Sequence, residues 1–118
     1  MKKIIIYSYS KCSTCKKATK WLDQNNISYE LKDILKEPPS ESILKLALVQ
    51  FSSNRKKIFN TRGKSFKEME IDINKISNEQ MIELLTNDGK LIKRPFLVIN
   101  KSKLILGFNE EEYSDNFV

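Results

Sequence analysis

The stretch that determines the fold is KIIIYSYSKCSTCKKATKWL, residues 3–22. Its first part, residues 3–9, is rich in β-branched and aromatic residues, a composition typical of a buried strand. Small polar residues over 10–14 then favour a turn and a helix N-terminus. The apolar spacing that follows predicts a helix to about residue 25, with its buried face formed by Cys15, Ala18, Trp21 and Leu22.

A second strand is expected over residues 27–33, after the Asn25-Asn26 pair that ends the helix. Strand, turn, helix and strand make a β-α-β unit, and this unit places Cys12 and Cys15 at its strand-to-helix turn. The middle of the chain favours helices instead. Its predicted elements are a helix over 40–50, a short helix over 53–59, a loop at 60–63 and a helix that begins at the capping-box sequence 77–80 and ends at 87–89.

The last third returns to strands. Pro95 precedes an apolar strand over 96–99, and residues 100–103 form a hairpin into a strand over 104–106. A final helix begins at Asn109. The order β-α-β, helical block, β-β-α predicts an α/β, thioredoxin-like fold: one domain over 1–118 with a mixed four-stranded sheet and a helical insertion over about 36–90.

Composition excludes several classes of function. The chain has 118 residues, of which 40% are hydrophobic and 31% charged, as expected of a globular protein. No apolar run approaches the roughly 20 residues of a membrane span. The basic start is followed by an apolar run too short for a secretory signal. We therefore expect a cytoplasmic protein with no membrane partner.

The residues that are missing narrow the chemistry. The chain has no histidine, which excludes Ser-His-Asp and Cys-His catalytic arrangements and any His-ligated metal. Its three glycines lie far apart, so there is no phosphate-binding or dinucleotide-binding glycine motif. Two cysteines cannot complete a four-thiolate zinc site. We expect neither a metal nor a bound cofactor.

The net charge of +6 is unevenly distributed along the chain. Residues 1–67 carry 15 Lys/Arg and 5 Asp/Glu, a net of +10, whereas residues 68–118 carry 6 and 10, a net of −4. A basic half can attract nucleic acid, anionic substrates or an acidic protein. Because these lysines are scattered and not interleaved with aromatic residues, they favour a solvated surface, and we predict no direct nucleic-acid binding.

The two cysteines form a Cys-x-x-Cys pair with a clear chemical use. Cys12 is placed at a helix N-terminus, where unpaired N–H groups and the helix dipole favour a thiolate, as do Lys11 and Lys16 beside it. Cys12 is thus the predicted nucleophile. Cys15, one turn further on, can resolve a disulfide formed at Cys12. The alternatives are two unreactive apolar side chains or half of an intermolecular metal site, but the β-α-β context favours redox chemistry.

Arg94-Pro95 is the second candidate element. A proline is tolerated at the first residue of a strand, which is one explanation for it. In thioredoxin-like folds, however, a cis-proline at this point lies opposite the cysteine turn and shapes the substrate groove. Arg94 would then hold an anion or stabilise the Cys12 thiolate, because its planar guanidinium suits oxyanions and carboxylates.

Four segments resemble the arsenate reductase (ArsC)/Spx family, in order and over essentially the whole chain. They are residues 11–18 (KCSTCKKA), 60–63 (NTRG), 88–95 (DGKLIKRP) and 107–112 (GFNEEE). The resemblance implies a thioredoxin-like fold with a helical insertion and Cys12 as the reactive cysteine. It also places Pro95, Ser13 and Thr14 around the substrate groove.

The resemblance also bears on what the site binds. Glutathione- and glutaredoxin-coupled arsenate reductases have one cysteine in this motif and bind the oxyanion with three arginines. Arg94 matches one of these, the second position falls on Asn60 with Arg62 two residues away, and the third falls on Gly107. Arg94, Arg62 and Lys11 are therefore the expected anion-binding residues. The second cysteine, Cys15, favours an internal disulfide cycle.

We accordingly expect a thiol-dependent reductase that acts on a disulfide or a small oxyanion. Its electrons would come from glutathione and glutaredoxin or from thioredoxin, so a redox protein is an expected partner. The alternative is an Spx-like regulator that binds RNA polymerase, which the basic N-terminal half and the segment 107–110 would suit. Against it, the chain is shorter, and the polymerase-contacting glycine has no match at residues 50–53.

Overall fold

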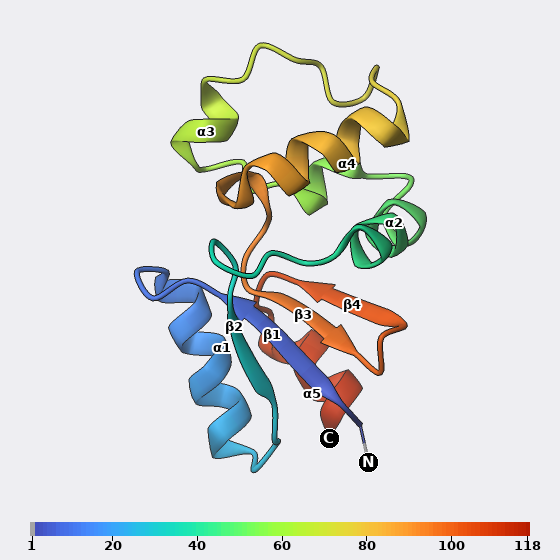
Figure 1. Ribbon diagram of the computed structural model, residues 1–118. Helices are drawn as coiled ribbons and strands as arrows, with labels where there is room; N and C mark the ends of the chain where they lie inside the picture. Colours follow the sequence, from blue (N-terminus) through green and yellow to red (C-terminus); the bar gives the residue numbers. More distant parts are fainter. Residues whose placement is uncertain (1) are drawn as a thin grey trace.

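The computed structural model describes residues 2–118, and Met1 lies outside them. Four strands form one mixed sheet in the order β2-β1-β3-β4 (Figure 1). The central strand β1 is parallel to β2 and antiparallel to β3, which in turn is antiparallel to β4. This arrangement confirms the predicted fold class. The strands are β1 (Ile4–Ser8), β2 (Glu30–Asp33), β3 (Phe96–Ile99) and β4 (Lys103–Leu106).

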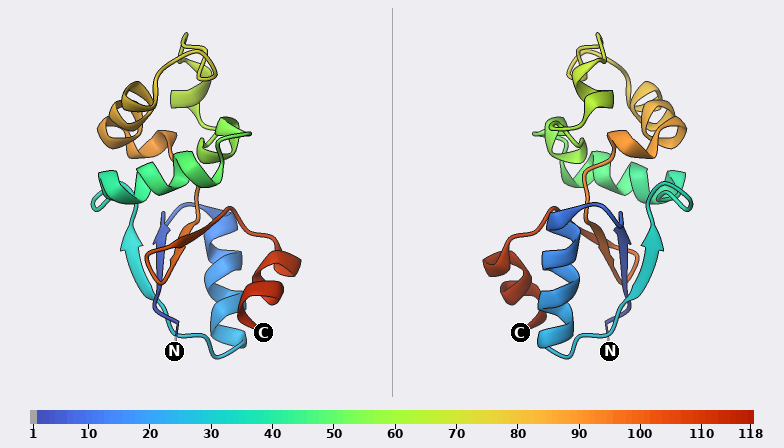
Figure 2. Two further views of the ribbon diagram at one scale, coloured as in Figure 1. Left: turned by 90° about the vertical axis from the view of Figure 1, so that its right-hand side faces the viewer. Right: turned by 90° about the vertical axis from the view of Figure 1, so that its left-hand side faces the viewer.

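Two helices, α1 (Ser13–Gln24) and α5 (Glu110–Phe117), cover one face of the sheet (Figure 2). Because side chains alternate along a strand, every second residue of β1, β3 and β4 faces these helices. The core between them is closed by the fully buried Tyr113, whose ring meets Trp21 edge-on at 5.5 Å and Phe108 at 4.8 Å between centroids. The other buried members of this cluster are Ile4, Ile6, Ala18, Leu22, Leu97, Ile99 and Ile105.

The segment between β2 and β3 is helical and lies at one end of the sheet (Figure 1). It consists of α2 (Glu41–Gln50), η1 (Arg55–Ile58), α3 (Lys64–Lys67), α4 (Asn78–Asn87) and η2 (Gly89–Leu91). Its buried residues, such as Leu44 and Leu85, share one apolar cluster with Tyr7 and Phe96 of the sheet. The Gln50 side chain also accepts from the backbone N–H of Leu104 and donates to its carbonyl, at 3.0 and 2.7 Å.

Side-chain caps mark the helix starts that the sequence predicted. Ser40 caps α2, and Ser77 with Gln80 forms the complete capping box of α4. The Asn109 side chain accepts from the N–H of Glu112 at 2.9 Å and starts α5. These three predictions are confirmed, because a polar oxygen three residues before an unpaired N–H satisfies that donor.

Other boundaries differ from the prediction. The short helix expected over 53–59 is a 3-10 turn at η1, and both α3 and η2 were not predicted. The second strand begins at Glu30 instead of 27, because Asn26 has a positive φ of 56° and the Ile27 N–H still bonds to the Leu22 carbonyl. Among the described residues, no helix is long and apolar enough to cross a membrane.

Candidate active site

The cysteine turn is built by the end of β1 and the start of α1. The Cys12 N–H donates to the Tyr9 carbonyl at 3.0 Å, which closes a turn directly after the strand. Cys12 itself is the N-cap of α1, with extended backbone angles, and its Sγ accepts from the N–H of Cys15 at 3.3 Å. The half-buried Cys12 sulfur therefore sits on the unpaired N–H groups of a helix N-terminus, which favour negative charge.

Cys15 has a different environment. Its side chain is 1% exposed and lies on the buried face of α1, and both cysteines are free thiols. Burial raises the pKa of Cys15 to about 11, with a contribution from its hydrogen bond to Cys12, against opposing hydrogen bonds from Tyr9 and Ser8. Cys15 is thus a protonated thiol at neutral pH, next to the more accessible sulfur of Cys12.

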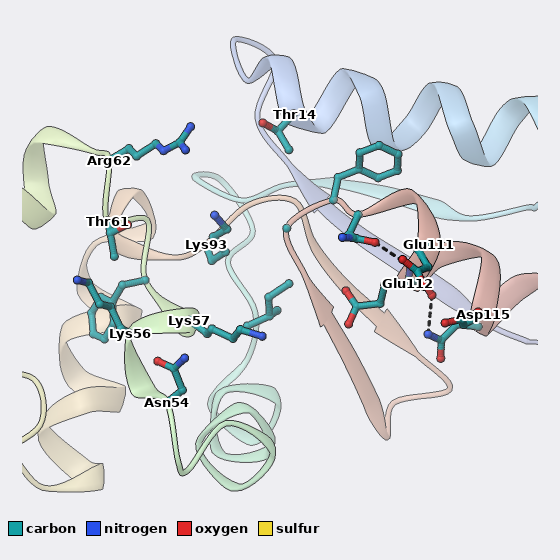
Figure 3. Close-up of a pocket in the computed structure, with 16 residues that line it drawn as sticks. Thr14, Asn54, Lys56, Lys57, Thr61, Arg62, Lys93, Glu111, Glu112 and Asp115 are labelled. Carbon is teal, nitrogen blue, oxygen red and sulfur yellow. Dashed lines mark hydrogen bonds between the residues drawn. The ribbon is translucent and has the colours of Figure 1, made fainter.

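A groove of about 950 Å³ begins beside Thr14, two residues after Cys12 (Figure 3). One wall comes from the segment around η1 and from Lys93, and the opposite wall comes from α5. The charges on the two walls have opposite signs. The first wall carries Lys56, Lys57, Arg62 and Lys93, and the second carries Glu111, Glu112 and Asp115.

Backbone pairing between two distant segments builds the basic wall. Phe59 and Ile92 form an antiparallel bridge. On either side of it, the Asn60 N–H donates to Leu91 and the Lys93 N–H donates to Ile58, both at 2.8 Å. This short ladder joins the segment that carries Lys56, Lys57 and Arg62 to the segment that carries Lys93, more than 30 positions later in the chain.

Lys93 was not among the predicted site residues. Its side chain occupies the space beside Gly107, where the Cβ of a larger residue would lie 3.1 Å from the Lys93 Cε. Gly107 also has a positive φ of 83°, so glycine is favoured there by its backbone as well. Because residue 107 has no side chain, the aliphatic part of the Lys93 side chain has room to lie in the groove.

Arg94 lies in a different cavity from Arg62. Its guanidinium carbon is 4.7 Å from the centroid of the Tyr9 ring, a cation–π contact. It lines a smaller cavity of about 330 Å³ together with Asn60 and Lys90. Lys93 and Arg94 are adjacent in the sequence, but they lie before β3 begins at Phe96, and no local sequence pattern assigns either side chain to a particular cavity.

The remaining predicted residues lie around the turn. The Arg94-Pro95 bond is cis, Pro95 is buried, and its carbonyl accepts from the Gly107 N–H at 2.9 Å. Lys11 and Ser13 are exposed at the turn, whereas Thr14 is half-buried and lines the groove. Within residues 2–118 no group of three or more His, Cys, Asp or Glu side chains is arranged to hold a metal ion.

Comparison with known proteins decides the family. The ArsC family model matches residues 7–116. The chain belongs to the ArsC family. Among curated proteins, this ArsC family chain is 35% identical to the uncharacterized protein YusI of Bacillus subtilis, over 97% of this chain and 98% of that one. It is 31% identical to the global transcriptional regulator Spx of Lactiplantibacillus plantarum, over 92% and 82% of the two chains.

A solved structure confirms the thioredoxin-like architecture of this ArsC family chain. It is that of a possible arsenate reductase from Streptococcus mutans, which is 34% identical, covers 97% of this chain and 99% of its own, and superimposes with a TM-score of 0.85. The similar proteins thus include one described as a possible arsenate reductase and one named as a global transcriptional regulator. Proteins with different named roles therefore share this family and fold.

Proposed function

We propose that this ArsC family protein is a thiol–disulfide oxidoreductase in which Cys12 is the nucleophile and Cys15 the resolving cysteine. The observation that carries the proposal is the position of the Cys12 sulfur, 3.3 Å from the N–H of Cys15 at the N-terminus of α1. The helix end stabilises a thiolate there, and the buried thiol of Cys15 lies one turn away to take over in the second step.

The reaction balances without a further cofactor. The Cys12 thiolate attacks one sulfur of a substrate disulfide, which forms a mixed disulfide and releases the other substrate sulfur as a thiolate. Cys15 then loses its proton to that thiolate or to water and attacks the Cys12 sulfur. A Cys12–Cys15 disulfide forms, the second substrate sulfur leaves as a thiolate that water then protonates, and two electrons have passed to the substrate.

An external dithiol must return those two electrons to the protein. We propose thioredoxin, or glutathione with glutaredoxin, as the donor in the cytoplasm. A small oxyanion such as arsenate is a second acceptor in this proposal, since Lys11 at the turn and Arg94 over the Tyr9 ring supply cations near Cys12, and Arg62 supplies another in the neighbouring groove. The name of the Streptococcus mutans neighbour supports reductase chemistry at this site.

The proposal is tested by mixing the reduced protein with 2-hydroxyethyl disulfide, a small uncharged disulfide. The wild type should lose both free thiols and two hydrogens of mass, and a dithiol should restore them. Cys15→Ser should stop at a mixed disulfide on Cys12, and Cys12→Ser should not react at a comparable rate. A wild type that forms only intermolecular dimers would contradict the proposal.

A second candidate is an Spx-like regulator, favoured by the identity to a protein named global transcriptional regulator Spx over 92% of this chain. In that case the same cysteine pair would sense oxidants, and the chain would bind RNA polymerase. Pull-down with the isolated polymerase α subunit, using reduced and oxidised protein, separates the two. Specific retention of the α subunit would establish the regulator, and its absence together with disulfide turnover would establish the enzyme.

A further inference from the structure

The groove beside Thr14 contains more charge than the thiol chemistry explains. Seven charged side chains line it, and none of the seven forms an ion pair in residues 2–118. Charged groups at a surface usually lie close to groups of opposite sign or are dispersed in solvent. Here they are gathered around one groove without pairing.

The two signs are sorted onto opposite walls. Figure 3 shows the cations on the side of the helical insertion and Glu111, Glu112 and Asp115 on the side of α5. The acidic wall is favoured locally, because carboxylates in the first turn of α5 interact well with the helix N-terminus. The basic wall is held together by the Phe59–Ile92 bridge, which joins the segment that contains η1 to the segment that contains Lys93. The result is an electric field across the groove, strongest where solvent is displaced.

We propose that this groove binds the cysteine-containing segment of a polypeptide disulfide substrate, with acidic residues against the insertion wall and basic residues against α5. This inference rests on the proposed function, because it supplies the substrate class for Cys12. A volume of about 950 Å³ is at the upper end of the roughly 300–1,000 Å³ of small-ligand pockets. Seven charges on two walls exceed what a single amino-acid disulfide can contact, whereas a peptide can meet both walls at once.

The residues nearest the cysteine turn set the expected order of charges. In the view of Figure 3, Arg62 and Lys93 are drawn on the side of the groove where Thr14 lies, and Lys57 and Asn54 are drawn further along it. An acidic residue close to the substrate cysteine would therefore meet Arg62 and Lys93, and further acidic residues would meet Lys57. Such pairing holds the substrate sulfur in reach of Cys12 and raises the rate of the first attack.

The test uses three peptides of equal composition, each with one cysteine bonded to 2-mercaptoethanol as a mixed disulfide. In the first, two glutamates precede the cysteine and two lysines follow it. The second has the reverse order, since the walls do not fix the direction of the chain, and the third alternates the charges. One of the two segregated peptides should oxidise the wild-type protein about tenfold faster than the alternating peptide at low salt, and the difference should shrink with added salt.

Variants locate the effect in the groove. The double variant Lys56→Glu/Lys57→Glu should no longer react faster with the favoured segregated peptide than with the alternating peptide. Each peptide rate is divided by the rate of the same variant with 2-hydroxyethyl disulfide, which corrects for changes in the reactivity of Cys12. The matched control is Lys20→Glu with Lys36→Glu, which makes the same change in net charge at exposed positions outside the groove. The control should keep the wild-type preference.

The outcomes separate this inference from the proposed function. A protein that reduces 2-hydroxyethyl disulfide but treats all three peptides alike would overturn the inference alone. The same holds if the preference survives the Lys56/Lys57 reversal, or if cystine reacts as fast as the favoured peptide. A protein whose Cys12 reacts with none of these disulfides would instead overturn the proposed function.

Discussion

The two cysteines differ in surroundings far more than their spacing in the sequence indicates. Cys12 is half-buried on the N–H groups of α1, whereas Cys15 is 1% exposed on its core-facing side. The sequence could place both at a helix start, because small polar residues follow a strand there. It could not show that Cys12 itself is the cap, since that depends on the turn closed by the Tyr9 carbonyl. The division of roles between the sulfurs follows from this geometry.

Iodoacetamide should therefore modify Cys12 well before Cys15. The thiolate is the reactive form, and a pKa of about 11 leaves Cys15 almost wholly protonated near neutral pH. Since the thiolate fraction grows about tenfold for each unit of pH below the pKa, Cys15 labelling should still be accelerating at about pH 10. Peptide mapping of the alkylated protein across pH measures both rates. Faster labelling of Cys15 at neutral pH would contradict the assignment of roles.

Arg94 is the residue whose role in anion binding is easiest to isolate. Its guanidinium lies over the Tyr9 ring, where a planar group can stack in a way that a lysine ammonium cannot reproduce. If Arg94 holds an oxyanion, Arg94→Lys should weaken arsenate or sulfate binding about tenfold, because the charge stays but the paired hydrogen bonds are lost. Calorimetry measures the affinity, and Arg62→Ala serves as the comparison from the other cavity. An unchanged affinity in Arg94→Lys would remove Arg94 from the anion site.

Gly107 has a backbone conformation that favours glycine, and it also lies against the Lys93 side chain in the groove. Gly107→Ala should destabilise the protein by about 1 kcal/mol or more, because alanine is disfavoured at a φ of 83°. The added Cβ would also press on the Lys93 side chain, 3.1 Å away. Urea unfolding gives the stability, and the rate with the charge-segregated peptide reports Lys93. A variant as stable as the wild type would show that the local backbone relaxes at no cost.

The helices illustrate which elements a sequence can reveal. Capped helices were predicted well, because Ser40, Ser77 and Asn109 each indicate a start through a local hydrogen bond. The 3-10 turns η1 and η2 and the single turn α3 were not predicted as such. They are short, and the bridge between Phe59 and Ile92 stabilises this region through a contact between distant parts of the chain. Local patterns contain no signal for such contacts.

The cap of α5 can be tested by itself. Asn109→Ala should lower the free energy of unfolding by about 1 kcal/mol, because the N–H of Glu112 loses its side-chain acceptor. Asn109→Ser is the matched control, since serine also caps well and should retain most of the stability. Urea denaturation followed by circular dichroism measures both variants. Equal losses in the two would show that the contribution of Asn109 does not come from the cap.

The charged groove is a property of the whole molecule. The sequence shows a basic half and an acidic half, but the groove takes its cations from residues 56–62 and from Lys93, which lies in the acidic half. Arg62 and Lys93 face one cavity, whereas Arg94 faces another. The residues predicted to form one anion site are therefore divided by the fold. The division depends on the backbone ladder around Phe59 and Ile92, which joins segments more than 30 residues apart. Local sequence patterns do not predict such a pairing.

The apolar cluster shared by the helical insertion and the sheet predicts that the two unfold together. Leu44 of α2 is fully buried in a cluster that includes Tyr7 and Phe96 of the sheet. Leu44→Ala should therefore cost about 2–5 kcal/mol of stability. Circular dichroism reports all the helices, and the fluorescence of the single Trp21 reports the opposite face of the sheet.

In Leu44→Ala, the urea midpoints measured by circular dichroism and by fluorescence should fall by the same amount relative to the wild type. We expect this although Trp21 and Leu44 lie in different apolar clusters separated by the sheet. This follows because a chain with one cooperative transition cannot lose the insertion while keeping the sheet. Ala47→Gly at a neighbouring buried position of α2 tests whether any loss within that helix acts in the same way. If the Trp21 midpoint stays at its wild-type value while the dichroism signal shifts, the insertion is a separate folding unit, and the groove between it and α5 is free to change its width.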